Sequence, residues 1–356
     1  MKYSDRLTVV GIVCLIVFLV SGFTPWVPES LGAPDKSIVL KFAHQNPPQG
    51  RSTKKFLTPW AKSVEDATKG KVKITQYPAQ SLIKAREIVS GIEGGIADIG
   101  WSPMGYFPGR FPLTDVMTLP FFNVPGARNN SLILQELFES TPAVQKHFAN
   151  LKLLFMNTSD PYVLLTTKKP VRNLDDLKGM KIRVLGSNQA ETFKRLGASP
   201  LFMPMPGTYS AAEKGVIDGA VLPWAAAATF RLWEVIHYWS DIPVFLGTFF
   251  VIMNKNAWNG LPPDVQKEVM SVSSLHGAEF AAKTQFGPEI YDEIQVKAKA
   301  AGKPMQRVTL DPGEFDKWKK IGGEPIWDQW VNQMEKKGMP GRMVFEKARK
   351  LMEKHR

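Results

Sequence analysis

The sequence predicts an α/β protein that is divided into two lobes of similar build. Three observations support this class. The chain has 356 residues, and chains of this length usually form about two domains. Short apolar runs alternate with longer segments of helical periodicity, which is typical of parallel α/β units. Two short sequence patterns also occur twice, in the same order along the chain.

The elements expected in the first lobe follow from the spacing of apolar residues. Residues 38–43 form a short apolar run that predicts a strand. A helix is expected at 54–68, because apolar side chains recur at helical spacing from Phe56 and Trp60 onward. Gly70 is expected to end this helix. The other elements expected here are a strand at 71–76, a helix at 82–92 and a strand at 96–101.

The repeated patterns place glycines and aspartates at matching points of the chain. Residues 178–183 echo residues 69–74, and residues 213–219 echo residues 93–99. In each pair a helix end with glycine leads into a strand, and glycine suits the left-handed residue just past a helix end. The strand of the second pair carries an aspartate near its start. We therefore expect two lobes of similar build, with a binding site in the cleft between them.

We expect the chain to cross between the lobes and return. Apolar runs predict strands at 151–156 and 162–167 for the first crossing and at 249–253 for the return. Helices are expected at 263–282 and 288–301, and in the rest of the C-terminal part. The predicted division is a first lobe of 34–156 plus about 249–290, a second lobe of 157–248, and C-terminal helices in 291–356 that pack across the lobes.

The first 33 residues are expected to be a signal peptide rather than part of the fold. Lys2 and Arg6 precede an apolar run at 7–20, which is shorter than the roughly 20 residues that span a bilayer. A polar stretch with prolines follows, so we expect cleavage after Ala33 and export to the periplasm. A retained membrane anchor is the alternative. Cys14 is the one cysteine of the chain, so the mature protein would contain no thiol.

The remaining composition argues against several functions. The net charge is +12, but no long Lys/Arg block of the kind used for nucleic acids occurs, so we expect no nucleic-acid partner. The histidines lack metal-ligand spacing, and we expect no metal and no cofactor. Residues 100–105 differ from a nucleophile elbow, because Pro103 directly follows Ser102. We expect a binding protein, and a periplasmic enzyme on a two-lobe fold is the alternative.

Arg183 is the residue that most directly indicates a binding function. It lies near the end of a predicted strand at 181–185, and a helix is expected to begin near Gln189. A side chain at the carboxyl end of such a strand points into the crevice of an α/β fold. The free N–H groups of the following helix favour anions at the same place. A guanidinium can bind a carboxylate through two parallel hydrogen bonds.

Several motifs together resemble the solute receptors of TRAP transporters, the DctP family. The strongest is DDLKGMKIRV at 175–184, preceded by KPV at 169–171. The similarity covers most of the chain after the predicted signal peptide. The other motifs are YPAQSL at 77–82, ADIG at 97–100, LPFF at 119–122, GASP at 197–200 and GVIDGA at 215–220.

The resemblance implies a two-lobe periplasmic binding protein fold, with strands crossing between the lobes and a long helix spanning both. It implies a non-enzymatic receptor, expected to be a monomer, that binds an organic acid through Arg183. The receptor would deliver this acid to the membrane subunits of a TRAP transporter. A receptor for an ATP-driven importer or a chemosensor is the alternative.

Two departures from the family pattern predict a less polar pocket than many relatives have. Many relatives carry a second arginine where this chain has the apolar run 163–165, and a polar residue where it has Leu222. We therefore expect a monocarboxylate with an apolar or aromatic body. Bulky or polar residues that fall where the family lines its cleft are expected to contact it: Trp101, Met203, Trp224, Phe107 and His44.

Overall fold

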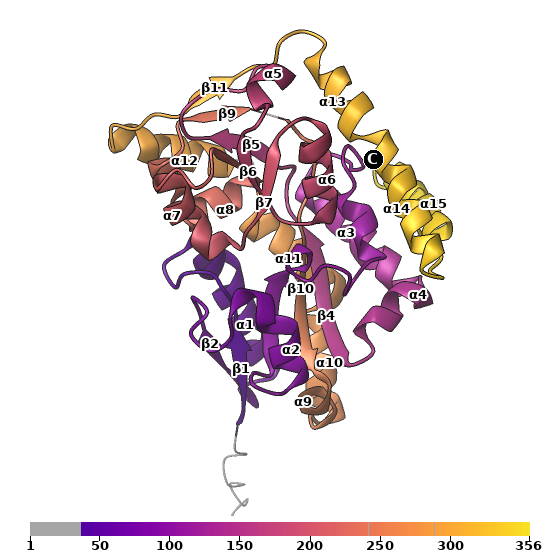
Figure 1. Ribbon diagram of the computed structural model, residues 1–356. Coiled ribbons are helices and arrows are strands. Elements are labelled where there is room, and N and C mark those ends of the chain that lie inside the picture. Colours follow the sequence, from indigo (N-terminus) through magenta and orange to yellow (C-terminus); the bar gives the residue numbers. More distant parts are fainter. Residues whose placement is uncertain (1–36, 241, 288) are drawn as a thin grey trace, which may run out of the picture. The chain divides into compact units, whose positions relative to one another are not determined.

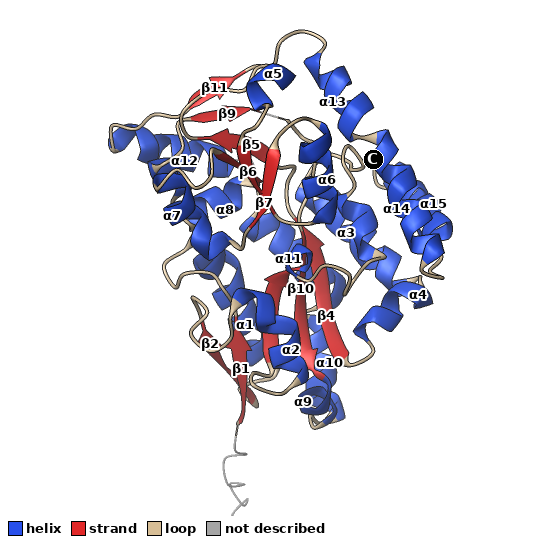
Figure 2. Ribbon diagram, viewed as in Figure 1, coloured by secondary structure: helices blue, strands red, loops and turns tan. Residues whose placement is uncertain are grey.

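The computed structural model describes residues 37–240, 242–287 and 289–356. Residues 37–356 belong to one compact unit, which contains two β-sheets flanked by helices (Figures 1 and 2). The predicted α/β class is thereby confirmed. The predicted signal peptide and Cys14 lie outside the described residues. None of the helices described for residues 37–356 is both long enough and apolar enough to cross a bilayer.

The first sheet has five strands, and its central strand comes from far along the chain. The strand β1 is parallel to β2 and β3, whereas β10 runs antiparallel between β3 and β4. In spatial order the strands are β2 (Val72–Tyr77), β1 (Ile38–Ala43), β3 (Ile99–Pro103), β10 (Thr248–Asn254) and β4 (Leu151–Thr158).

The second sheet has six strands and repeats this mixture of directions. The strand β6 is parallel to β7 and β8, whereas β5 runs antiparallel to β8 and β9. In spatial order the strands are β11 (Gln306–Val308), β9 (Tyr238–Ser240), β5 (Val163–Thr166), β8 (Gly219–Leu222), β6 (Lys181–Val184) and β7 (Ser199–Phe202). The edge strand β11 lies in a part of the chain for which the sequence predicted helices.

The echoed sequence patterns have the same structural role in both sheets. Gly95 and Gly215 both have positive φ, 74° and 69°, in the turn that precedes a strand, as the sequence predicted. The Asp98 carboxylate accepts a hydrogen bond from the backbone N–H of Lys41 at 2.7 Å. The Asp218 carboxylate accepts the equivalent bond from Lys181 at 2.8 Å. These aspartates are therefore structural, because each fastens its strand's start to a neighbouring strand.

Two of the segments that connect the sheets are hydrogen-bonded to each other. One follows β4 and the other precedes β10. The backbone N–H of Ser159 donates to the carbonyl of Gly247 at 3.0 Å, and that of Tyr162 donates to the carbonyl of Phe245 at 2.8 Å. The chain therefore crosses between the sheets as a paired connection.

The expected long helical stretch is present, but it is divided. It consists of α10 (Pro263–Ser271), α11 (Ser274–Gln285) and α12 (Glu289–Ala300). The helix α11 contacts α3 and β4 of the first sheet, and α12 contacts α8 beside the second. Phe286 is extended, with φ −117° and ψ 154°, and the sequence Gly287-Pro288 that follows disfavours a helix.

The other helices cover the sheets, and the C-terminal ones contact elements beside both. The helix α13 contacts α6, and α15 contacts α3. Their bounds are α1 (Thr58–Ala67), α2 (Ile88–Glu93), α3 (Ala127–Glu139), α4 (Pro142–Gln145), α5 (Leu174–Leu177), α6 (Ser187–Arg195), α7 (Thr208–Glu213), α8 (Trp224–Thr229), α9 (Lys255–Asn259), α13 (Glu314–Gly322), α14 (Glu324–Lys336) and α15 (Gly341–Lys354).

Candidate functional site

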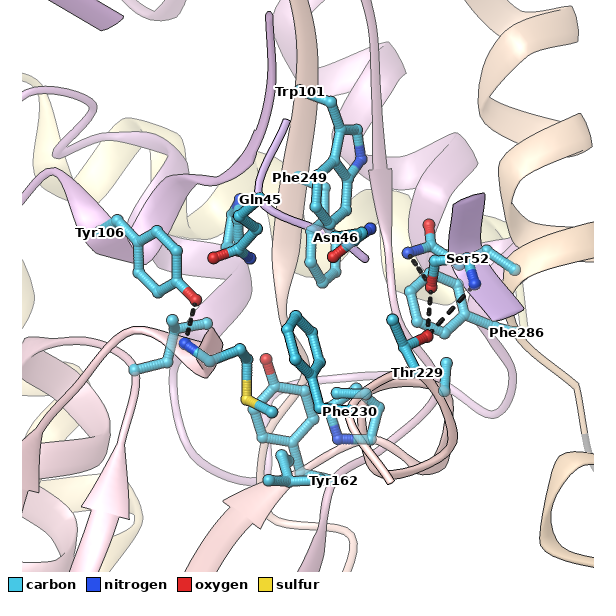
Figure 3. A pocket seen from close by; sticks show the side chains of 18 of the residues that line it. Gln45, Asn46, Ser52, Trp101, Tyr106, Tyr162, Thr229, Phe230, Phe249 and Phe286 are labelled. Carbon is cyan, nitrogen blue, oxygen red and sulfur yellow. Dashed lines mark hydrogen bonds between the residues drawn. The ribbon is translucent and has the colours of Figure 1, made fainter. Parts of the chain in front are cut away.

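A pocket lies where the carboxyl ends of parallel strands from both sheets meet, and it encloses about 420 Å³ of space between atoms. This is the position at which α/β sheets bind ligands. Side chains from both sheets and from the break between α11 and α12 line it (Figure 3). The lining residues are Gln45, Asn46, Ser52, Trp101, Pro103, Tyr106, Tyr162, Arg183, Leu185, Met205, Leu222, Pro223, Ala225, Ala226, Thr229, Phe230, Phe249, Gln285 and Phe286.

Arg183 is a buried cation without a counter-ion. It lies on β6 and is 1% exposed. Its Nε donates a hydrogen bond to the carbonyl oxygen of Met203 at 2.9 Å, whereas its Nη2 has no partner. Burial lowers the pKa of this guanidinium. Among the described residues, the ionisable groups that raise this pKa again are Tyr106 and Tyr162, and no carboxylate does so. Arginine nevertheless stays charged at neutral pH. A buried unpaired charge is costly, so this site is suited to an anionic partner.

The two tyrosines beside Arg183 do not neutralise it. Burial raises the pKa of Tyr106, against the opposing effect of the guanidinium, and it also raises the pKa of Tyr162. Both phenols therefore stay neutral at physiological pH. The Tyr106 hydroxyl accepts a hydrogen bond from the backbone N–H of Met205 at 2.8 Å, which ties the segment after β7 to the first sheet's side of the pocket.

Aromatic side chains form flat walls in the pocket. The rings of Trp101 and Phe249 stack with their centroids 5.4 Å apart and their planes 9° apart. Phe249 also contacts Phe286 with a centroid distance of 5.6 Å. Phe230 and Leu222 line the same space. Flat apolar walls of this kind are suited to an aromatic or other apolar body.

A small polar network lies in the pocket on the side of Ser52 and Thr229 (Figure 3). The hydroxyls of these residues are 3.0 Å apart, and the backbone N–H of Ser52 donates to the Thr229 hydroxyl at 3.2 Å. The amide Nε2 of Gln285 donates to the Ser52 hydroxyl at 3.2 Å. This network joins the segment between β1 and α1, the end of α8 and the end of α11.

The segment after β2 holds the loop that carries Gln45 and Asn46. The backbone N–H of Ala79 donates to the carbonyl of Asn46 at 3.0 Å, and that of Gln80 donates to the carbonyl of His44 at 3.2 Å. Ala79 and Gln80 both have positive φ, 53° and 61°. Such conformations are costly for residues other than glycine and cluster at functional sites. The motif at 77–82 therefore fixes the backbone of a loop that lines the pocket.

Arg51 holds the break between α11 and α12. Its Nη1 donates to the carbonyls of Thr284 and Gln285 at 3.0 and 2.9 Å. Its other nitrogens form ion pairs with Glu289 at 3.0 Å and Glu293 at 3.3 Å. One side chain therefore binds the last carbonyls of α11 and two carboxylates of α12, and it fixes the backbone of a residue that lines the pocket.

The structure brings Arg183 and Trp101 together in the pocket, but the other predicted site residues lie beside it. Met203 contributes its carbonyl oxygen to Arg183. The Phe107 ring stacks on Phe250 at 5.8 Å and lines a neighbouring pocket. Trp224 packs against Trp239 and Tyr291, each at 5.1 Å. His44 is fully buried beside Phe42, and burial lowers its pKa to about 4.

The other sequence-based expectations about the site have mixed outcomes. Leu222 lines the pocket, whereas the apolar run 163–165 packs in the hydrophobic core. The start of α6 lines the neighbouring pocket together with Asp115. Among the described residues, no group of three or more His, Cys, Asp or Glu side chains is placed to hold a metal ion.

Sequence reasoning missed most of the lining residues. Tyr162 and Phe249 lie on or beside predicted strands, but a strand pattern alone does not show which face meets the other sheet. Asn46 and Thr229 lie in loops or at a helix end, where no periodic signal exists. Gln285 had a detectable signal, because it lies within the predicted interruption between the helices expected at 263–282 and 288–301.

The fold and the pocket define a solute-binding protein with two α/β lobes. The family model described as "Bacterial extracellular solute-binding protein, family 7" (DctP) matches residues 42–339. The chain therefore belongs to the DctP family of TRAP-transporter solute receptors, as its motifs predicted. It is a solute receptor and not an enzyme.

Relatives with solved structures agree with this assignment. A TRAP solute-binding protein from Rhodoferax ferrireducens in complex with copurified benzoate has a TM-score of 0.83 and 27% identity, covering 90% of this chain and 98% of that chain. A marine metagenome TRAP protein with co-crystallised 3-hydroxybenzoate has a TM-score of 0.81 and 29% identity, covering 90% and 99%. The TsaT protein of Comamonas testosteroni, described as an outer membrane transporter protein, is 25% identical over 304 residues, which is 84% of this chain and 87% of the relative.

Proposed function

We propose that this chain is a periplasmic receptor for an aromatic monocarboxylate, which it delivers to the membrane subunits of a TRAP transporter. The observation that carries the proposal is the buried guanidinium of Arg183, which has an unpaired Nη2 inside an aromatic pocket. A ligand carboxylate pairs with this cation and removes the cost of its burial.

The single cation of the pocket favours one carboxylate over two. Arg183 is the one Lys, Arg or His among the residues that line the pocket. A second carboxylate would be buried without a partner, which is strongly unfavourable. The stacked rings of Trp101 and Phe249 offer an apolar surface to the body of the ligand. The benzoate and 3-hydroxybenzoate bound by the two solved relatives support this ligand class.

A thermal-shift screen with purified protein tests the proposal. We expect benzoate and phenylacetate to raise the melting temperature, and succinate and sugar acids to leave it unchanged. Arg183→Ala should abolish the shift. Arg349→Ala is the matched control, because this arginine is exposed on α15 and pairs with Glu346. Stabilisation by dicarboxylates alone would refute the proposed ligand class, and a full shift in Arg183→Ala would refute the role of Arg183.

Delivery to a membrane partner is tested separately. We expect a strain that lacks this receptor to lose uptake of the acid and to regain it with the wild-type protein. Native mass spectrometry of the protein purified from its host tests the expected monomer and identifies any acid that stays bound. Uptake that continues unchanged without the receptor would contradict the proposed delivery role.

A further inference from the structure

Besides Arg183 Nη2, four buried polar atoms of the pocket lining have no hydrogen-bond partner, and they belong to Gln45, Asn46, Trp101 and Gln285. Asn46 and Gln285 are considered together because Gln285 is bonded to Ser52 and Asn46 faces Ser52 in Figure 3. Asn46 is 2% exposed and Gln285 is 3% exposed. The Nδ2 of Asn46 and the Oε1 of Gln285 have no hydrogen-bond partner. Both residues line the pocket. A buried polar atom without a partner is costly, and two such atoms in one aromatic pocket indicate a polar group of the ligand.

The two atoms have complementary hydrogen-bonding roles. The amide Nδ2 of Asn46 is a donor, and the carbonyl Oε1 of Gln285 is an acceptor. A hydroxyl group both accepts and donates, so a hydroxyl placed between the two atoms would satisfy both. A carboxylate has acceptors alone and would face the Gln285 oxygen without a cation nearby. The pair therefore favours a hydroxyl over a second carboxylate.

Hydrogen bonds hold the backbone of both residues, and the Gln285 side chain is also held at one end. Asn46 is held by the N–H of Ala79, and Gln285 is held through its carbonyl by Arg51 and through its Nε2 by Ser52. The Gln285 amide thus has one satisfied end and one end left for a ligand.

This polar region lies away from the carboxylate-binding end of the pocket. The charge of Arg183 opposes the rise in the pKa of Tyr106, so Tyr106 marks the Arg183 end of the pocket. Figure 3 shows Tyr106 and Ser52 on opposite sides of the pocket. Asn46 and the rings of Phe249 and Phe230 lie between them in this view. Asn46 faces the space between the rings and Ser52 in this view. A ligand whose carboxylate pairs with Arg183 would present the remote part of its body to this region.

We propose that the receptor prefers aromatic monocarboxylates that carry a hydroxyl on the ring, remote from the carboxylate. The hydroxyl accepts a hydrogen bond from Asn46 and donates one to Gln285, while the carboxylate pairs with Arg183. This inference rests on the proposed function, since it deepens the ligand class of the same pocket.

Isothermal titration calorimetry with benzoate, 3-hydroxybenzoate and 4-hydroxybenzoate tests the inference. We expect one hydroxylated isomer to bind the wild-type protein on the order of 10- to 100-fold more tightly than benzoate, because it satisfies atoms that benzoate leaves unpaired. Asn46→Leu and Gln285→Met should bring this ratio close to one, mainly by weakening the hydroxylated acid. Ser102→Ala is the control: its hydroxyl is also buried without a partner, but it lies outside the pocket lining, and the ratio should persist.

The outcomes separate this inference from the proposed function. Equal affinity of the wild-type protein for all three acids, lost in Arg183→Ala, would overturn the hydroxyl preference alone. Failure of all three acids to bind would overturn both. A preference that persists in both Asn46→Leu and Gln285→Met would show that other groups select the hydroxyl. The comparison of acids on the wild-type protein needs no variant, so a variant that fails to fold does not remove the test.

Discussion

Arg183 and Met203 are joined by a hydrogen bond of 2.9 Å from the guanidinium Nε to the carbonyl oxygen. This bond uses a donor at one edge of the guanidinium and leaves Nη2 as a buried donor without a partner. The side chain is thus oriented by the protein before a ligand arrives. Such preorganisation reduces the cost of ordering groups on binding.

Replacing Arg183 by methionine should separate stability from function. Arg183→Met removes a buried charge that has no counter-ion, and apolar replacement even of a buried ion pair is often neutral or stabilising, by about 1–4 kcal/mol. We expect the ligand-free variant to unfold at a higher urea concentration than the wild type, with no stabilisation by benzoate. Urea unfolding followed by circular dichroism, with and without ligand, measures both effects. A less stable ligand-free variant would contradict the view that the unpaired charge is a cost.

Loss of the guanidinium should also weaken binding directly. Arg183→Ala is expected to reduce affinity by on the order of 2–4 kcal/mol, as for truncation of one partner of a buried pair. Isothermal titration calorimetry measures this loss of binding free energy, with the acid that gives the largest stabilisation in the thermal-shift screen. Unchanged affinity would remove Arg183 from the site.

Arg51→Met should loosen the break between α11 and α12. The variant loses two hydrogen bonds to carbonyls and ion pairs with Glu289 and Glu293. We expect lower stability and faster ligand dissociation, because Gln285 and Phe286 lose their fixed backbone. Stopped-flow dissociation measures the second effect. The matched control is Lys54→Met, a change at an exposed cation close in the sequence. Equal dissociation rates in both variants would show that Arg51 does not position the pocket wall.

Asp115 should make the protein less stable as the pH rises. Burial raises the pKa of this carboxyl from 3.8 to about 7, against an opposing effect of Lys337. Between these pH values the folded state keeps a proton that the unfolded state has lost. Stability from this group is therefore present at low pH and is lost as the pH rises toward 7.

The Asp115→Asn variant tests this dependence. Between pH 5 and pH 8 its melting temperature should fall less than that of the wild type. Asp175→Asn is the control: a hydrogen bond and ion pair with Lys178 lower the pKa of that exposed carboxyl, so its titration lies below this range. Parallel curves for the wild type and Asp115→Asn would contradict the prediction.

Ligand binding should change tryptophan fluorescence through Trp101. This indole stacks on Phe249 at the pocket wall, and its Nε1 is buried without a partner. We expect a change in emission when an aromatic acid binds, and loss of most of that change in Trp101→Phe. Trp327→Phe should keep the fluorescence change, because Trp327 lies on α14, where its ring contacts Phe122 and Phe345. A response that survives in Trp101→Phe would place the ligand elsewhere.

The sequence predicted those elements of the fold that are determined by neighbouring residues. Periodic apolar residues and the glycines at 95 and 215 mark elements and turns through short-range sterics, so the α/β class followed from them. The strand β11 was missed, because it has three residues and two are exposed, which gives no apolar pattern. Pairing with β9 rather than propensity forms this strand.

The site was predictable only in part, for a related reason. Arg183 was selected because its strand, the glycine turn and the following helix are adjacent in the sequence, and because it lies in the family motif at 175–184. Gln285, Thr229 and Asn46 meet across long sequence separations, and no local pattern reports such contacts. Trp224 shows the converse: its position fits the family cleft, but aromatic neighbours on β9 and α12 hold the side chain outside the pocket lining.

Phe286 belongs to the pocket wall and also to the interruption of the helical run that contacts elements of both sheets. On the proposed function, a bound acid would therefore contact the residue at which this helical run is interrupted, and binding and the conformation of the connector would be coupled through one side chain.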